Sequence, residues 1–293
     1  MAFDRLISLS AALRAFSARN RIALTVIAVL LFGGGMVWAV GQLDVTLASL
    51  EWRPLLVVVL VFVPLDIALS ALNLSLLAKI VDTRISAKDS LVATVIGRVA
   101  EVLPIPGAAL VRGAALLRSG ASFKAMIGVL AVSSLMTLAL AGVFAAIPLL
   151  PREPWLAYVL LAGSVLVFIG SMGWVARKAG AAIVSAMLAL RLGILALTTL
   201  RFVACFLVIG SIVPVRDALL FVVGGTVTTY VGILPAGLGV SEGISAALAL
   251  LIGVLPAAAF LAAAINRLCG LGVGGVIALA MIATGAYQPR PAT

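Results

Sequence analysis

Long, uninterrupted apolar stretches constrain this chain more than any other feature of its sequence. Residues 22–40 and 55–77 each contain at most one charged residue, and a helix needs about 20 apolar residues to cross about 30 Å of hydrocarbon. Of all 293 residues, 64% are hydrophobic and 10% are charged, whereas soluble domains average about 25% charged residues. Transmembrane β-strands alternate apolar and polar residues over about ten positions, and no such alternation occurs. The sequence therefore predicts an all-α, polytopic membrane protein.

Apolar runs separated by charged loops predict about six transmembrane helices. The first is the run at 22–40, and the others lie at about 54–79, 124–147, 155–176, 192–213 and 257–284. A signal peptide has an apolar core of only about 7–15 residues, so we interpret the first run as an uncleaved helix. Six spans place both termini in the cytoplasm.

Two further stretches are broken by proline and glycine. Residues 89–120 and 217–255 each contain two apolar pieces that are too short to cross comfortably, and Pro and Gly between them stop a helix. Each stretch therefore predicts a re-entrant helical hairpin; two kinked but ordinary spans are the alternative. The backbone of the breaks is supplied by Pro104, Pro106, Gly107, Pro235, Gly237 and Gly239.

The order of these elements predicts an inverted repeat within a single transmembrane domain, residues 1–293. Three full spans separate the hairpins, so the hairpins must enter from opposite faces. The first half covers about 54–150, with its helix broken at 103–107, and the second covers about 190–285, broken at 234–239. Paired broken helices are typical of secondary transporters with a midplane site, and half-helix N-termini favour anions.

Charge placement supports this orientation. Most of the 20 lysines and arginines fall at the cytoplasmic ends of the predicted spans, among them Lys178 and Arg191. Only Arg53, Arg152 and Arg216 fall outside. Such a positive-inside bias is typical of a multi-pass protein of the bacterial cytoplasmic membrane. We therefore attribute the formal net charge of +10 to membrane orientation and contact with anionic lipid rather than to nucleic-acid binding.

Ionisable residues at predicted membrane depth are the candidate site. Each costs roughly 2.5–3.5 kcal/mol at a helix centre, so they must be paired or hydrated. At predicted membrane depth there are four arginines and three acids, and the excess positive charge favours binding of an anion. We expect Arg267 near Glu242 and Glu101 near Arg98. The candidate substrate-binding residues are Arg112, Arg267, Glu242, Glu101, Arg98 and Ser241, and the candidate coupling or structural residues are Asp66 and Arg201.

Several chemistries are excluded or disfavoured by composition. The chain has no histidine, which removes histidine bases and histidine metal ligands. Cys205 and Cys269 lie in apolar runs, where cysteine behaves as a small hydrophobe. We therefore expect no catalytic residue, no metal and no cofactor.

The second break carries a family resemblance. Residues 234–242, with the sequence Leu-Pro-Ala-Gly-Leu-Gly-Val-Ser-Glu, followed by Gly253-Val254 and Arg267, resemble the transmembrane region of lysylphosphatidylglycerol synthases. This flippase-like family includes the MprF flippase domain and YbhN-like membrane proteins. Residues 97–118 resemble its first motif, although Glu101 stands where the family often has Asn, and Ala108-Ala109 replace a Gly-acid pair.

The resemblance implies lipid translocation between leaflets. The substrate would be a phospholipid, glycolipid, polyprenyl-linked lipid or hopanoid-type lipid, and the protein could form homo-oligomers. Glu101, Glu242 and Asp66 are candidates for proton coupling, because low dielectric raises the pKa of a carboxyl group. Two alternatives stay open: a membrane-embedded lipid-modifying enzyme, and a non-transporting scaffold of a lipid-biosynthesis complex.

Overall fold

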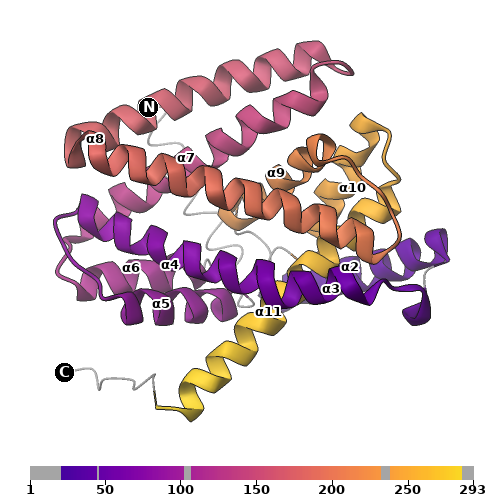
Figure 1. The fold of residues 1–293 in the computed structure, drawn as a ribbon, viewed down its shortest axis with the longest axis horizontal. Coiled ribbons are helices and arrows are strands. Elements are labelled where there is room, and N and C mark those ends of the chain that lie inside the picture. Colours follow the sequence, from indigo (N-terminus) through magenta and orange to yellow (C-terminus); the bar gives the residue numbers. More distant parts are fainter. Residues whose placement is uncertain (1–20, 45, 102–106, 232–237, 286–293) are drawn as a thin grey trace.

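The computed structural model describes residues 21–44, 46–101, 107–231 and 238–285. Over these residues the fold is entirely helical and contains no strand (Figure 1). The elements are α2 (Arg21–Leu43), η1 (Leu47–Ser49), α3 (Trp52–Val57), η2 (Val58–Phe62), α4 (Val63–Ile80), α5 (Ala87–Ala100), α6 (Gly107–Arg118), α7 (Phe123–Leu149), α8 (Pro154–Val208), α9 (Val215–Val231), α10 (Val240–Ile252) and α11 (Pro256–Ala283).

Five of the described helical stretches are long and apolar enough to span a membrane: 26–43, 52–80, 123–149, 154–208 and 256–283. Large apolar side chains on them face outward, with Leu30, Leu166 and Leu279 exposed by 67%, 76% and 68%. Water-soluble proteins rarely expose broad apolar patches. The all-helical class and the membrane-compatible helices predicted from the sequence are therefore present.

The helix α8 corrects the predicted boundaries of two spans. It runs from Pro154 to Val208 and bends at Gly180, whose φ of 79° and ψ of 170° are non-helical; Figure 1 shows it doubling back there. The second segment therefore begins at 181 and ends at 208, not at 192 and 213. Glycine adopts this backbone at low cost, and the Ala- and Leu-rich residues after it are strong helix formers.

The stretch 52–80 is a continuous helix with one widened turn. Residues Val58–Phe62 form a π-helical turn between α3 and α4. Pro64 follows directly, and a proline inside a helix has no N–H and crowds the carbonyl four residues earlier, here that of Leu60. The wider turn accommodates this crowding, and Asp66 lies just after it.

Two helical hairpins lie at opposite ends of the helix bundle (Figure 1). The helices α5 and α6 pack together at Gly97, where an added Cβ would lie 3.5 Å from the Cα of Ala108. The helices α9 and α10 pack together at Gly224, where it would lie 3.2 Å from the Oγ of Ser245. Gly107 begins α6, and Gly239 caps α10 with a left-handed φ of 78°. The other four residues predicted to form the breaks lie outside the described residues: Pro104, Pro106, Pro235 and Gly237.

An ion pair holds the turn between α7 and α8 against the first turn of α9. Arg152 donates two hydrogen bonds, of 2.9 and 3.1 Å, to the two carboxylate oxygens of Asp217. These hydrogen bonds raise the pKa of the Arg152 guanidinium. The second hairpin is thereby fixed where it starts.

Candidate functional site

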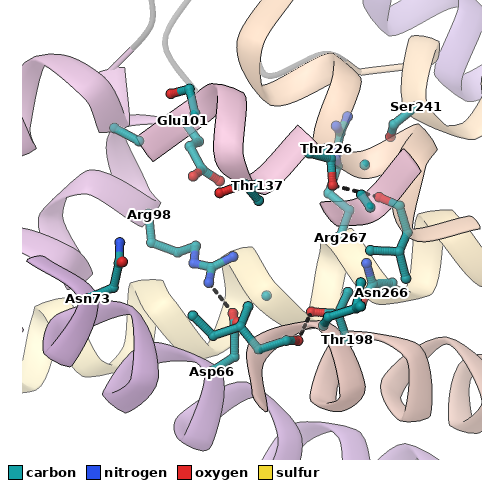
Figure 2. A pocket seen from close by; sticks show the side chains of 18 of the residues that line it. Asp66, Asn73, Arg98, Glu101, Thr137, Thr198, Thr226, Ser241, Asn266 and Arg267 are labelled. Carbon is teal, nitrogen blue, oxygen red and sulfur yellow. Dashed lines mark hydrogen bonds and ion pairs between the residues drawn. The ribbon is translucent and has the colours of Figure 1, made fainter. Parts of the chain in front are cut away.

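A cavity of about 350 Å³ lies in the centre of the bundle, among helices α4 to α11 (Figure 2). Charged side chains from the first hairpin and from the surrounding helices line it. Within the described residues these are Asp66, Arg98, Glu101, Arg112, Arg191, Arg201 and Arg267. Six of the seven ionisable residues predicted at membrane depth therefore surround one cavity, and the seventh, Glu242, contacts Arg267.

Asp66 joins two arginines from different helices. Its carboxylate accepts a hydrogen bond from Arg98 of α5, and Figure 2 shows the Arg98 guanidinium directed at it. The Nη1 atom of Arg201, on α8, lies 3.4 Å from Oδ2 of Asp66. Asp66 and Arg201 are 5% and 6% exposed. Because an unpaired buried charge is strongly unfavourable, this cluster stabilises the packing of α4, α5 and α8.

The second ion pair joins α10 to α11. Glu242 is fully buried, and its Oε1 lies 3.4 Å from Nη1 of Arg267; the proximity predicted from the sequence is present. Neither carboxylate oxygen of Glu242 accepts a hydrogen bond from a described residue. Glu242 occupies the first turn of α10, where the helix dipole also stabilises a negative charge.

The remaining predicted residues lie around the same cavity. Glu101 caps the C-terminus of α5, Arg112 projects from α6, and Ser241 begins α10. Glu101 was expected near Arg98, and the two interact electrostatically, but among the described residues the ion-pair partner of Arg98 is Asp66. The reason is that Glu101 lies at the end of α5, whereas Asp66 approaches Arg98 from the neighbouring helix α4.

Arg191 was assigned to a cytoplasmic helix end from the sequence, and this assignment is wrong. The residue is 6% exposed, lines the cavity and donates a hydrogen bond to the Oγ of Ser133 on α7. Because α8 continues through 181–208 without a loop, Arg191 lies eleven positions into a helix. Had the Ala- and Leu-rich residues before Arg191 been interpreted as a helix, the sequence would have placed Arg191 inside that helix.

Neutral polar side chains complete the lining, and sequence reasoning missed them. Ser133, Ser134 and Thr137 share one side of α7, since residues three and four apart lie on one helix face. The others come from α4, α8, α9, α10 and α11: Asn73, Thr198, Thr226, Ser245 and Asn266. The sequence signal that could have identified these residues is the presence of hydroxyl and amide side chains within apolar runs.

The position of Arg98 depends on a glycine of α11. A Cβ added to Gly274 would lie 3.0 Å from Cγ of Arg98. The aliphatic part of Arg98 therefore passes directly over the backbone of α11, which aims its guanidinium at Asp66. Any side chain at Gly274 would have to displace Arg98.

The described residues contain no group of three or more His, Cys, Asp or Glu that could hold a metal ion. Cys205 is buried, and both it and Cys269 are free thiols.

No protein-family model matches this chain, and no curated protein matches it. What the protein does must therefore be argued from the cavity.

Proposed function

We propose that this protein translocates lipids, moving a polar headgroup between leaflets through the central cavity while the acyl chains stay in hydrocarbon. The observation that carries the proposal is a guanidinium-rich cavity of about 350 Å³ inside helices whose outer surfaces are apolar. Such a cavity offers an anionic or zwitterionic headgroup a polar path across the bilayer. Guanidinium groups bind phosphate through paired hydrogen bonds and stay charged when buried.

The finer architecture is part of the same proposal. The two segments of α8 act as separate spans, which gives six spans in all. The hairpins α5–α6 and α9–α10 are re-entrant from opposite faces and form an inverted repeat, with both termini in the cytoplasm of a bacterial cell. Support comes from the cavity lining, to which the first hairpin contributes Arg98 and Arg112 and the second contributes Thr226 and Ser241.

Helix N-termini add to this argument. The helices α6 and α10 both begin at the cavity, where Gly107 and Ser241 form part of its wall. The unpaired N–H groups of a first helical turn carry partial positive charge and attract anions. We further propose that the chain belongs to the flippase-like family that its second break resembles.

Of the three candidate proton carriers, we propose Glu101. Asp66 is held by two arginines and Glu242 lies against Arg267, so both carboxylates already have a cationic partner. Glu101 lines the cavity and forms no ion pair with a described residue within 4.0 Å.

The test is lipid exchange between leaflets in liposomes that contain the purified protein. Fluorescent phospholipids in the inner leaflet should become accessible to an external quencher faster than in protein-free liposomes of the same composition. A lipid-modifying enzyme would instead change the mass of the lipid, and a scaffold would do neither. Exchange no faster than in protein-free liposomes would contradict the proposal.

A further inference from the structure

The hydroxyl groups around the cavity carry information about its ligand that the charges alone do not. Among the described residues, five cavity-lining hydroxyls donate to the carbonyl four positions earlier in their own helix, at 2.8–2.9 Å. They are Ser134, Thr137, Thr198, Thr226 and Ser245.

A hydroxyl has one proton to donate and lone pairs that accept. Because these protons are already used within the helices, the hydroxyls present acceptors to the cavity, except that of Ser245, which is fully buried. The other four lie on three different helices, α7 to α9, and Figure 2 shows Thr137, Thr198 and Thr226 at separate places around the cavity. A ligand that fills the cavity must therefore bring hydrogen-bond donors to several of its sides.

The arginines set a second requirement. Even without Arg191, the four arginines at positions 98, 112, 201 and 267 exceed the three acids at positions 66, 101 and 242 by one positive charge. This excess favours an anionic group on the ligand and disfavours donors that are themselves cations, such as ammonium groups. Neutral donors, such as the hydroxyls of a polyol or sugar, satisfy both requirements.

We infer that the cavity binds a phosphate headgroup that carries a polyol or sugar, with the phosphate at the guanidinium groups and the ligand hydroxyls donating to the serine and threonine oxygens. The inference rests on the proposed function and deepens it by naming the headgroup class. A volume of about 350 Å³ lies at the small end of ligand pockets, which span about 300–1,000 Å³. It suits a headgroup without its acyl chains.

The experiment compares two lipids with identical acyl chains and the same single negative charge. Phosphatidylglycerol has two headgroup hydroxyls, and phosphatidylmethanol has none. In liposomes, the protein should exchange phosphatidylglycerol severalfold faster. Thr137→Val and Thr198→Val each remove one acceptor and keep the shape of the side chain. Each should lower the ratio of the two rates by about two- to tenfold, the value of one hydrogen bond.

Thr284→Val is the matched control. Thr284 also donates to the carbonyl four positions earlier, at 2.8 Å, but it is exposed at the end of α11 and does not line the cavity. Its variant should keep the ratio of the wild-type protein. All rates are compared per folded, monodisperse protein, so that a variant that folds poorly is not mistaken for one with altered preference.

The outcomes separate this inference from the proposed function. Equal rates for the two lipids, both faster than in protein-free liposomes, would overturn the polyol inference and leave translocation intact. If no lipid is exchanged, the thermal stability of the detergent-solubilised protein is measured with soluble glycerol phosphate and methyl phosphate. Greater stabilisation by glycerol phosphate would then support the headgroup chemistry while contradicting translocation, and equal stabilisation would contradict both.

Discussion

Buried charges in this molecule are arranged in small groups that join neighbouring helices. Asp66 bridges arginines of α5 and α8, and Glu242 joins Arg267 across α10 and α11. The two groups differ in which of their side chains can still contact a ligand. Asp66 engages two guanidinium groups at once, whereas Arg267 has one carboxylate partner and a side chain that also lines the cavity. We therefore propose that Asp66 has a structural role and that Arg267 contacts the substrate.

Asp66→Asn should destabilise the fold more than it lowers exchange per folded molecule. The change leaves the charges of Arg98 and Arg201 without their shared carboxylate, and removing one partner of a buried pair costs about 3–5 kcal/mol. Thermal unfolding in detergent measures the effect, and Glu51→Gln, at an exposed position, serves as control. Unchanged stability with lost exchange would instead assign Asp66 to coupling.

Arg267→Lys should impair exchange although the charge is kept, and Arg267→Ala should impair it further. Lysine presents a single ammonium group, whereas the guanidinium plane can face Glu242 and a phosphate at the same time. Exchange rates in liposomes, corrected for the folded fraction, measure the effect. If the Lys variant is as active as the wild-type protein, charge alone is sufficient and bidentate binding is not required.

At the scale of elements, the hairpins depend on close approach of backbone. A Cβ on Gly107 would lie 2.1 Å from the carbonyl oxygen of Ala100, so α6 begins where only glycine fits against α5. At the second hairpin, a Cβ on Gly239 would lie 2.9 Å from the Cβ of Leu31 on α2. The helix α2 thus packs directly against the start of α10.

Gly239→Ala should reduce stability and exchange more than Gly253→Ala. These glycines flank α10 at its two ends and have similar left-handed φ angles, 78° and 70°. Both substitutions cost backbone strain, on the order of 1 kcal/mol. Only Gly239 has a neighbour within 4 Å of the added carbon, whereas Gly253 has none. Parallel unfolding and exchange measurements isolate the contact with α2; equal losses would show that this contact is unimportant.

At the scale of the whole molecule, apolar length and helix breakers were sufficient to predict the helical class, most helix positions and the two pairs of short helices on either side of the breaks. Hydropathy ended one predicted span near the bend, beside Arg177 and Lys178, but it could not show that the next helix begins directly after Gly180, because a single glycine makes the bend and no loop follows it. For the same reason it misplaced Arg191. The charged residues of the cavity could be predicted because charge is costly in an apolar helix, and so could the proximity of Glu242 and Arg267. The pairing of Asp66 with two arginines could not, since it depends on how helices face one another. Neutral hydroxyl groups cost too little free energy in an apolar helix to be recognised from the sequence as site residues.

The proposed topology predicts opposite exposure of two turns. In a variant without Cys205 and Cys269, a single cysteine at position 152 should react with an impermeant thiol reagent added to intact cells. A cysteine at position 177, close to the bend of α8, should react only after permeabilisation. The reverse pattern would contradict the proposed orientation, and equal labelling of both positions in intact cells would contradict the separation of α8 into two spans.

The central claim is that the cavity carries the headgroup, and lipid exchange by the double variant Arg112→Ala/Arg267→Ala tests it most directly. Both arginines line the cavity. The control is Arg53→Ala/Arg216→Ala, which removes the same charge from two exposed positions outside it. Per folded protein in liposomes, we predict that the cavity variant loses exchange by on the order of 100-fold, while the control stays within about twofold of the wild-type protein, as surface charges contribute little. Exchange by the cavity variant at the rate of the control would contradict the claim.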